Sequence, residues 1–205
     1  MTATFTSCED EDDSPPSNPT VAQDTIGTFI DNRDGTEYHW VTIGNNIWMS
    51  ENLAYQVDTG GCWAYDDDVN NVATYGYLYN WWTAKVVAPD GWHLATNNEW
   101  QEMIDFLGGE HYAGGKLKEE GTFHWQSPNL GGTNSSGFNG LPSGRRNDSN
   151  IGTYVHMDYY GYWWTSTEYE NSSPAYARYL YNDSKEAVIY GQPKEDAFSV
   201  RCVKD

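Results

Sequence analysis

The sequence predicts a single mixed α+β domain with two main helices, short antiparallel sheets and extensive loops. A chain of 205 residues can bury one sizeable core, and 10 Trp with 16 Tyr would supply much of it. An aromatic content of 16% beside 20 glycines favours short strands and tight turns over a helical bundle. Helical periodicity occurs in two stretches, whereas several other runs are typical of strands. We expect this domain to span residues 25–205.

The first 24 residues are rich in Ser, Pro, Asn and acidic residues and show no hydrophobic periodicity, which predicts a flexible tether. Residues 1–7 lack the basic start and apolar stretch of an intact signal peptide. Phe5-Thr-Ser-Cys8 resembles the end of a bacterial lipoprotein signal, and residues 9–13 resemble the acidic tract that directs Bacteroidetes-type lipoproteins to the outer face of the cell. We therefore expect that a preceding signal was removed and that a lipid on Cys8 anchors the chain to the bacterial outer membrane. The alternative is an acidic tail with an incidental cysteine.

The domain is expected to open with a small antiparallel meander. Residues 25–30 and 37–43 are strand-like runs, and residues 31–35 (Asp-Asn-Arg-Asp-Gly) form a turn signal between them. Residues 44–46 (Gly-Asn-Asn) are a second turn signal, which precedes a third run, Ile47-Trp-Met49.

Two helices are expected next. Residues 75–85 place Leu78, Trp81 and Trp82 at helical spacing, which predicts a short amphipathic helix. Thr96-Asn-Asn-Glu99 is a capping box that predicts the start of the second helix, and Gly108-Gly109 predicts its end. Within this helix the apolar residues recur at i, i+3, i+4 and i+7, as Trp100, Met103, Ile104 and Leu107. This stripe is expected to face the core.

The second half is expected to contain a loop at residues 129–138 and a final antiparallel sheet. The predicted strands of that sheet are residues 159–166, 175–182, 187–190 and 197–203. Seven tryptophans in strongly patterned segments are expected in the core: Trp40, Trp48, Trp81, Trp92, Trp100, Trp163 and Trp164.

Residues 168–196 carry Tyr, Asn, Ser, Asp and Glu without a fixed pattern, as binding surfaces and loops do. Alternate residues of a strand share a face, so Tyr176, Arg178 and Leu180 are expected to point away from Tyr179 and Tyr181. An exposed row of tyrosines and charges would suit a partner; the alternative is an ordinary solvated sheet face. The candidate ligand-binding residues are Tyr176, Arg178, Tyr181, Asp183, Lys185, Glu186, Tyr190 and Gln192.

The formal net charge of −19 disfavours nucleic acid and anionic membrane surfaces as partners, because a polyanion would be repelled. No nucleophile elbow, phosphate loop or dinucleotide fingerprint occurs in the sequence. The oxygens of Asp66, Asp68 and Asn70 could hold Ca²⁺, although the spacing lacks the twelve-residue calcium-loop pattern, and a solvated acidic turn is the alternative. No cofactor is required.

Two further groups have structural interpretations. If Cys8 carries lipid, Cys62 and Cys202 are candidates for one disulfide in an exported protein, and two buried thiols are the alternative. Arg145-Arg146 interrupts the acidic trend, which favours structural ion pairs with buried carboxylates.

Seven motifs, in order from Asp34-Gly-Thr-Glu-Tyr-His-Trp-Val-Thr-Ile-Gly44 to Phe198-Ser-Val-Arg-Cys202, resemble the Fibrobacter succinogenes major paralogous domain. The others are Trp48-Met-Ser-Glu-Asn-Leu53, Tyr75-Gly-Tyr-Leu-Tyr-Asn-Trp81, Ala88-Pro-Asp-Gly-Trp-His-Leu94, Gly114-Gly-Lys-Leu-Lys-Glu119 and Gly161-Tyr-Trp-Trp-Thr-Ser-Thr167. The resemblance implies a C-type lectin-like fold of the type shared by formylglycine-generating enzymes and the variable proteins of diversity-generating retroelements. One departure is Ala88, where many relatives carry a cysteine.

The resemblance implies binding rather than catalysis. Enzymatic members of the wider group use copper-binding cysteines, but the later half of this chain has Cys202 alone, so that chemistry is not carried over. Retroelement variable proteins bind ligands through diversified surface residues near the C-terminus. We expect a cell-surface adhesin or receptor-binding module for a protein or glycan on another cell, a phage or a host surface. The alternatives are a formylglycine-type or carbohydrate-active enzyme, or a structural component of a pilus or fibre tip.

Overall fold

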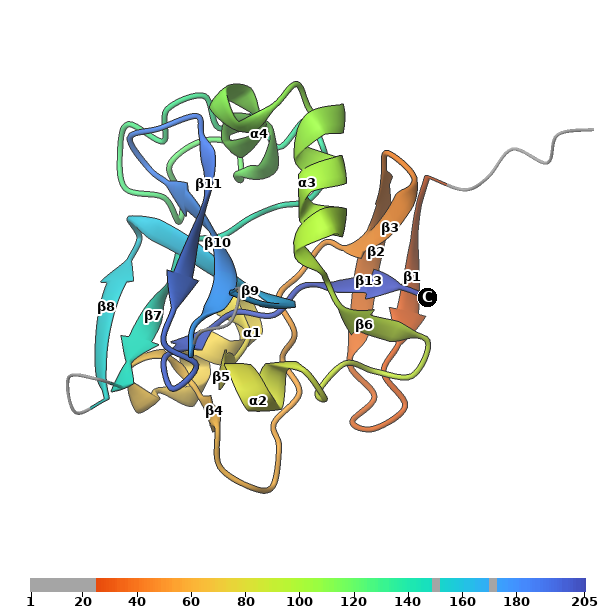
Figure 1. The fold of residues 1–205 in the computed structure, drawn as a ribbon, viewed down its shortest axis with the longest axis vertical. Coiled ribbons are helices and arrows are strands. Elements are labelled where there is room, and N and C mark those ends of the chain that lie inside the picture. Colours follow the sequence, from red (N-terminus) through yellow and green to blue (C-terminus); the bar gives the residue numbers. More distant parts are fainter. Residues whose placement is uncertain (1–24, 149–151, 170–172) are drawn as a thin grey trace, which may run out of the picture.

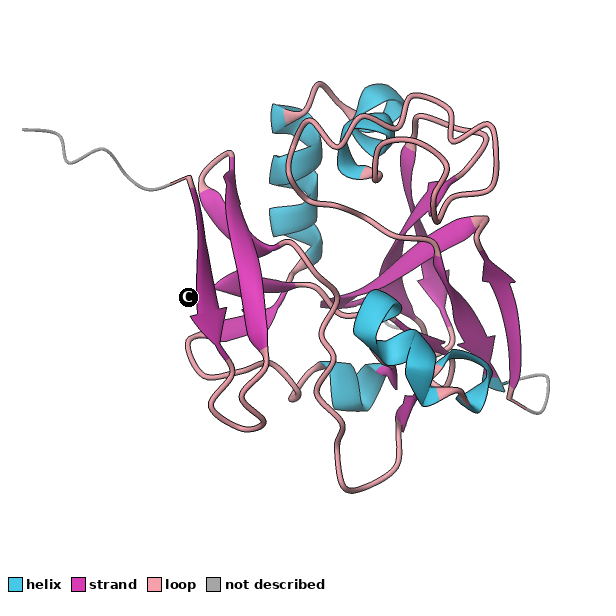
Figure 2. Ribbon diagram, turned by 180° about the vertical axis from the view of Figure 1, so that it is seen from behind, coloured by secondary structure: helices cyan, strands magenta, loops and turns pink. Residues whose placement is uncertain are grey.

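The computed structural model describes residues 25–148, 152–169 and 173–205. It is an α+β structure in which three small antiparallel sheets are combined with a few short helices and long connecting loops (Figures 1 and 2). The predicted tether and Cys8 lie outside the described residues. No helix in the described part has both the length and the apolar character that a membrane crossing requires.

The first sheet contains the predicted meander. Its strand order is β1-β2-β3-β13-β6, with β1 (Ile26–Ile30), β2 (Glu37–Ile43), β3 (Asn46–Met49), β13 (Cys202–Lys204) and β6 (Trp92–Leu94). The C-terminal strand lies between β3 and β6, with Val203 opposite both Trp48 and His93. The first and last strands of the chain, β1 and β13, therefore belong to the same sheet. The C-terminus lies beside this sheet in Figure 1.

The helix predicted after Thr96 is confirmed as α3 (Asn97–Phe106). Both halves of the capping box are present: the Glu99 N–H donates to Thr96 Oγ1 at 3.1 Å, and the Thr96 N–H donates to Glu99 Oε2 at 2.7 Å. The helix ends before Gly108, whose φ of +101° ordinary residues rarely adopt. Its apolar stripe is buried, as expected.

Helix α4 (Glu110–Leu117) was not predicted, because Gly114 and Gly115 lie in its interior and glycine lowers helix propensity. The structure explains Gly114 by close packing: a Cβ there would lie 2.1 Å from the carbonyl oxygen of Glu186. Tertiary contact, rather than local preference, therefore selects the glycine.

The prediction of a helix over residues 75–85 is wrong. Residues 78–80 form strand β5 (Leu78–Asn80), between the short helices α1 (Val72–Tyr75) and α2 (Trp81–Ala84). The apolar spacing arises because β5 is hydrogen-bonded between two other strands, so that Leu78 is buried by sheet pairing. The side chain of Asn80 then caps α2 by accepting from the Thr83 N–H at 3.0 Å.

Strand β5 belongs to the second sheet, which includes a hairpin that was not predicted. The strand order is β4-β5-β12-β7-β8, with β4 (Cys62–Trp63), β12 (Ala197–Phe198), β7 (Ser143–Asn147) and β8 (Thr153–Met157). Strands β7 and β8 form the hairpin, whose residues are mostly polar or half-buried, so it lacks a strong alternation of apolar residues.

The third sheet has the order β11-β10-β9, with β9 (Tyr160–Glu168), β10 (Ala175–Tyr181) and β11 (Ala187–Gln192). These are three of the four strands predicted for the final sheet. The fourth prediction is wrong, because residues 197–203 divide between β12 of the second sheet and β13 of the first. Between them, Ser199 bridges to Trp163 of β9. The C-terminal segment is therefore divided into two short strands and a bridge, and each of these pairs with a different sheet.

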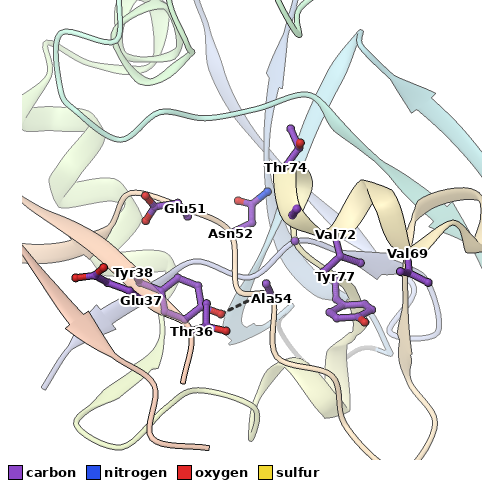
Figure 3. Close-up of a pocket in the computed structure, with 12 residues that line it drawn as sticks. Thr36, Glu37, Tyr38, Glu51, Asn52, Ala54, Val69, Val72, Thr74 and Tyr77 are labelled. Carbon is purple, nitrogen blue, oxygen red and sulfur yellow. Dashed lines mark hydrogen bonds between the residues drawn. The ribbon is translucent and has the colours of Figure 1, made fainter. Parts of the chain in front are cut away.

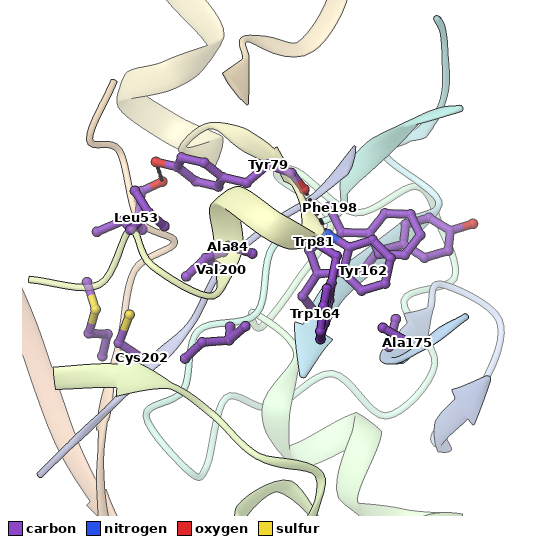
Figure 4. Close-up of a cluster of buried hydrophobic side chains, with 14 of the residues drawn as sticks. Leu53, Tyr79, Trp81, Ala84, Tyr162, Trp164, Ala175, Phe198, Val200 and Cys202 are labelled. Atoms are coloured by element: carbon purple, nitrogen blue, oxygen red, sulfur yellow. Dashed lines mark hydrogen bonds between the residues drawn. The ribbon is translucent and has the colours of Figure 1, made fainter. Parts of the chain in front are cut away.

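Aromatic rings and buried polar contacts hold these sheets together. Six of the seven tryptophans expected in the core are buried, and Trp40 is half-buried. The rings of Trp164 and Phe198 lie 4.3 Å apart, and Figure 4 shows them beside Tyr162 in the main apolar cluster. The Trp164 indole N–H donates to the Tyr79 carbonyl at 2.7 Å, which joins the third sheet to the second.

Asn52 and Arg201 form a polar centre inside this core. Asn52 Oδ1 accepts from Trp163 Nε1 at 2.8 Å and from Arg201 Nε at 2.7 Å. The other guanidinium nitrogens of Arg201 donate to the carbonyls of Met49, Phe138 and Asn139. Burial lowers the pKa of Arg201 to about 9.

The expected disulfide is not formed. Cys62 on β4 and Cys202 on β13 belong to different sheets, and both are free thiols. Burial raises the pKa of Cys62 to about 11 and that of Cys202 to about 12, so both are protonated at neutral pH. The alternative prediction is two buried thiols. Cys202 is buried as that alternative predicts, whereas Cys62 is half-buried.

Candidate ligand-binding surface

The predicted ligand-binding residues lie in three places on the third sheet rather than on one surface. Tyr181, Tyr190 and Gln192 lie on one face, Tyr176 and Arg178 on the opposite face, and Asp183, Lys185 and Glu186 in the β10–β11 turn. The strand register fixes this division, because residues paired across neighbouring strands share a face. The first of these groups shares its face with the tyrosines of β9 and with Tyr179.

Strand pairing gathers five tyrosines on that face, which we call the tyrosine surface: Tyr160, Tyr162, Tyr179, Tyr181 and Tyr190. Tyr179 pairs with Tyr162, Tyr181 pairs with Tyr160, and Ala177 pairs with Tyr190. Tyr162 and Tyr179 form its buried floor, Tyr160 and Tyr181 are half-buried, and Tyr190 is 53% exposed. The surface thus grades from core to solvent.

The rings of the tyrosine surface position one another. Tyr160 and Tyr162 are stacked, with centroids 5.7 Å apart and planes 9° from parallel. Tyr181 meets Tyr160 edge-on at 4.9 Å, and Tyr190 lies 5.4 Å from Tyr179. Such contacts limit ring rotation, so these side chains would lose little conformational entropy when a ligand binds.

Arg145 of β7 supplies a positive charge at the edge of the tyrosine surface. Its Nη1 donates to Gln192 Oε1 at 3.1 Å and lies 3.3 Å from Asp196 Oδ2, and its guanidinium carbon lies 5.6 Å from the Tyr162 ring centroid. The predicted ion pair with a buried carboxylate is therefore confirmed. Within the described residues, Arg145 Nε and Tyr179 Oη are buried without a hydrogen-bond partner.

His156 of β8, in the same hairpin as Arg145, also contacts the tyrosine surface. Its Nδ1 and the Tyr162 hydroxyl are 2.6 Å apart, and its ring lies 4.7 Å from that of Tyr160. Burial and the charge of Arg145 lower the pKa of His156, while burial raises the pKa values of Tyr162 and Tyr179. At neutral pH these groups are therefore uncharged, and Arg145 is the cation of this surface.

Arg178 is not a surface residue, which corrects the prediction that it anchors a ligand. It is 1% exposed, and its Nη2 donates to Asn97 Oδ1 at 2.7 Å and to Gln101 Oε1 at 3.0 Å, both on α3. The alternation along β10 is as predicted, but α3 and α4 cover the face that carries Arg178. Burial lowers its pKa to about 10.

Tyr176 and the β10–β11 turn are held by neighbouring segments. Tyr176 is half-buried, and its ring lies 4.9 Å from that of Tyr169. In the turn, Asp183 and Lys185 are exposed, and Glu186 lies 2.9 Å from His111 Nδ1. The turn can therefore present charged side chains beside the tyrosine surface.

A fully buried lysine, Lys118, holds the β10–β11 turn through hydrogen bonds to main-chain carbonyls. Lys118 Nζ donates to the carbonyls of Leu130, Tyr181 and Ser184 at 2.6–3.1 Å. Burial lowers the pKa of Lys118 to about 8. The three hydrogen bonds that Lys118 donates compensate for the burial of its ammonium group and connect the turn to the loop that contains Leu130.

The residues considered for calcium form a hydrogen-bonded acidic turn. Asp68 Oδ1 accepts from the N–H of Asn70 at 3.0 Å and from its Nδ2 at 2.7 Å, so Asp68 caps the short 3-10 helix Val69–Asn71. Asp66 has a φ of +54°. Among the described residues, no three His, Cys, Asp or Glu side chains are grouped as a metal site would require.

Sequence reasoning missed Tyr160, Tyr162, Tyr179 and His156 as components of the surface and assigned Arg145 a structural role only. Tyr160 and Tyr162 alternate along β9 with the core residues Gly161 and Trp163. That alternation could have predicted that the two tyrosines share the face of β9 opposite Trp163. No local pattern could have placed Arg145 and His156 beside them, because the β7–β8 hairpin meets the third sheet only through tertiary packing.

The chain is an α+β domain built on three small antiparallel sheets. A comparison with protein families shows which family this domain belongs to. The family model for the Fibrobacter succinogenes major domain matches residues 41–204, from within β2 to the last residue of β13. This match includes most of the chain, with the whole second and third sheets and the first sheet apart from β1 and the start of β2. The chain belongs to the Fibrobacter succinogenes major domain family. Comparisons with curated proteins and with solved structures gave no match.

Proposed function

We propose that this chain is a cell-surface ligand-binding protein, an adhesin or receptor-binding module, that captures a protein or glycan through the tyrosine surface. The observation that carries the proposal is a set of packed tyrosines beside Arg145 that extends from buried rings to the exposed ring of Tyr190. Tyrosine and arginine dominate binding hot spots because they combine apolar area with directional hydrogen bonds. The net charge of −19 disfavours a polyanionic ligand.

The test of binding compares two sets of tyrosine and phenylalanine substitutions. The purified chain would be applied to a glycan array and to intact bacterial cells, and the ligand identified there would be used to measure affinity. Tyr181→Ala with Tyr190→Ala should weaken binding more than about tenfold. Tyr112→Ala with Phe123→Ala is the matched control, because both residues are exposed elsewhere on the chain. Equal losses in the two variants would contradict the proposal.

We also propose that the architecture is the C-type lectin-like fold and that the chain is the variable protein of a diversity-generating retroelement. Family membership and the placement of the β10–β11 turn beside the tyrosine surface support this assignment. Comparison of alleles tests it. Substitutions should concentrate at adenine-rich codons for exposed positions such as Asp183, Lys185 and Tyr190, whereas Arg178 and Lys118 should stay constant because they are buried. Uniform divergence over the domain would refute diversification.

We further propose that a lipid on Cys8 anchors the chain to the bacterial outer membrane, facing outward. The small residues before Cys8 and the acidic residues after it support this localisation. Metabolic labelling with an alkyne fatty acid should mark the chain expressed with its signal in its native cell, and Cys8→Ser should abolish the label. Labelling that survives Cys8→Ser would disprove the anchor.

A further inference from the structure

A cavity that contains none of the residues of the tyrosine surface lies between the start of β2 and the helix α1. Its volume is about 440 Å³, within the range of small-ligand pockets. Figure 3 shows the carboxylates of Glu37 and Glu51 on one side and Val69, Val72 and Tyr77 on the other. The cavity therefore has one acidic wall and one apolar wall.

The floor of this cavity is rigid because it belongs to the buried polar centre. Asn52 lies at the floor and is held by hydrogen bonds to Trp163 and Arg201. Tyr38 is buried, and its hydroxyl accepts from the Ala54 N–H at 2.9 Å. The cavity is thus built on segments that the rest of the core holds in place, and a ligand would meet it already formed.

The acidic wall lacks a full complement of positive charge. His39 contacts both carboxylate oxygens of Glu51: its main-chain N–H donates to Oε2 at 2.9 Å, and its Nδ1 lies 2.8 Å from Oε1. Glu37 is exposed and has no cationic partner within the described residues. No Lys, Arg or His is among the described residues that line the cavity. A cation entering it would meet the exposed carboxylate of Glu37 and the carboxylate of Glu51, which also contacts His39.

The apolar wall defines the second property of the ligand. Val72 of α1 and Tyr77 present aliphatic and aromatic surface opposite the carboxylates. Ala73 also lines the cavity. A small hydrated metal ion would leave that surface unused. An alkyl chain that ends in a positive group would contact both walls at once, because such side chains bury the stem while the charged head remains near water.

We propose that this cavity is a binding site for an alkylguanidinium or alkylammonium group, separate from the tyrosine surface. The head would lie between Glu37 and Glu51, and the stem would pack on Val72 and Tyr77. The same chemistry is presented by a free amine or guanidine and by an arginine or lysine side chain of a partner protein. The overall negative charge of the chain would attract either source toward the cavity.

The test uses butylguanidinium as the probe and butylurea as its neutral isostere. In a ¹H–¹⁵N NMR titration of the full chain, butylguanidinium should shift the amide signals of Val72, Ala73 and Tyr77, and butylurea should not. The double variant Glu37→Gln/Glu51→Gln should weaken binding at least about fivefold, as expected for two partly exposed carboxylates. Glu195→Gln is the matched control, because Glu195 is exposed and lies outside the cavity.

A gain of charge inside the cavity provides an independent variant. Ala73 is exposed on α1, so Ala73→Arg should fold normally and place a resident guanidinium near the two glutamates. Binding of butylguanidinium should then be abolished, with the melting temperature unchanged. Undiminished binding to this variant would overturn the proposal.

A second titration identifies the source of the group. Tighter binding of acetyl-Gly-Gly-Arg-Gly-Gly-amide than of butylguanidinium would support a partner side chain, and the reverse order would support a free small molecule. General attraction of cations to an acidic protein is the rival explanation. It predicts shifts scattered over the whole surface and equal weakening by Glu195→Gln, and that result would also overturn the proposal.

Discussion

The two faces of strand β10 carry polar and aromatic residues alike, yet the structure uses them differently. One face, with Arg178 and Leu180, is covered by α3 and α4 and is almost completely buried. The other face, with Tyr179 and Tyr181, contacts the β7–β8 hairpin. Solvent exposure on this face increases from the buried Tyr179 to the exposed ring of Tyr190. Side-chain alternation separates the faces, but packing decides which face can reach a ligand.

The same contrast distinguishes the two buried arginines. All three guanidinium nitrogens of Arg201 donate to oxygen acceptors in the core. Among the described residues, Nη2 is the one guanidinium nitrogen of Arg178 with hydrogen-bond partners, and the carboxylate of Glu110 lies 3.8 Å from Nη1. Arg201 therefore connects segments, whereas Arg178 mainly fills space under the helices.

The largest effect is expected from Arg201→Met. The substitution removes the Arg201 hydrogen bonds to the Met49, Phe138 and Asn139 carbonyls, and it leaves Asn52 Oδ1 with Trp163 as its remaining donor. Each buried acceptor that loses its donor costs about 1–3 kcal/mol. We expect the free energy of unfolding to fall by at least about 3 kcal/mol, measured by urea denaturation. A loss below about 1 kcal/mol would contradict the assigned role of this polar centre.

The next largest effect is expected from Lys118→Met. Three carbonyl oxygens lose their shared donor, so the unfolding free energy should fall by about 2–3 kcal/mol. Hydrogen exchange should also accelerate at residues 182–186, because Lys118 holds that turn. Lys185→Met, an exposed position in the same turn, is the control and should leave both measurements nearly unchanged. Slow exchange in both variants would show that other contacts hold the turn.

Arg178→Met should have a smaller effect, although the side chain is almost fully buried. The apolar stem of Met retains most of the packing, and few hydrogen bonds are lost, so we expect a change of about 1 kcal/mol. Ligand affinity should not change, since Arg178 lies on the covered face. A large loss of affinity with an unchanged melting temperature would show that Arg178 takes part in ligand binding.

The smallest effect concerns pH and compares a histidine of the tyrosine surface with one of the first sheet. The pKa of His156 is lowered in the folded state, so the unfolded state takes up the proton first as pH falls below about 6.5. Wild type should therefore lose stability relative to His156→Gln between pH 7 and pH 5. Because His156 is exposed, the difference should stay below about 1 kcal/mol, measured by urea denaturation at both pH values.

His93 should behave in the opposite way. Burial lowers its pKa, but hydrogen bonds to Asp205 and Glu99 outweigh burial and raise it. Its contribution to stability is therefore complete below about pH 6.5 and is lost as pH rises through the raised pKa. His93→Gln should cost more at pH 5 than at pH 8, again by less than about 1 kcal/mol. Parallel pH profiles for the two variants would contradict the difference in environment.

Local sequence signals predicted the elements whose determinants are close in the chain. The capping box of Thr96 and Glu99, the glycine stop after α3 and the turns of the first meander were all predicted, because each depends on residues within one or two turns. Predictions failed where distant partners decide. Residues 78–80 become a strand because β4 and β12 pair with them, and residues 197–203 divide because three sheets meet there.

The candidate site follows the same division. The sequence identified residues 168–196 as unusual, and three of the eight predicted residues, Tyr181, Tyr190 and Gln192, lie beside the packed tyrosines. It could not predict that Arg178 is covered or that Arg145 and His156 complete the surface. Those contacts join residues far apart in the chain, and no local period encodes them.

The sequence by itself determined the family, the mixed α+β class, helix α3 and the tryptophan core, because motif order, capping and hydrophobic periodicity are local properties. Only the tertiary structure decided which face of β10 is open, how the last strands divide among the sheets and why Cys62 and Cys202 remain free thiols. The physical reason is that burial and sheet pairing depend on partners distant in sequence. The same polar residue is an exposed contact or a buried one according to what packs over it.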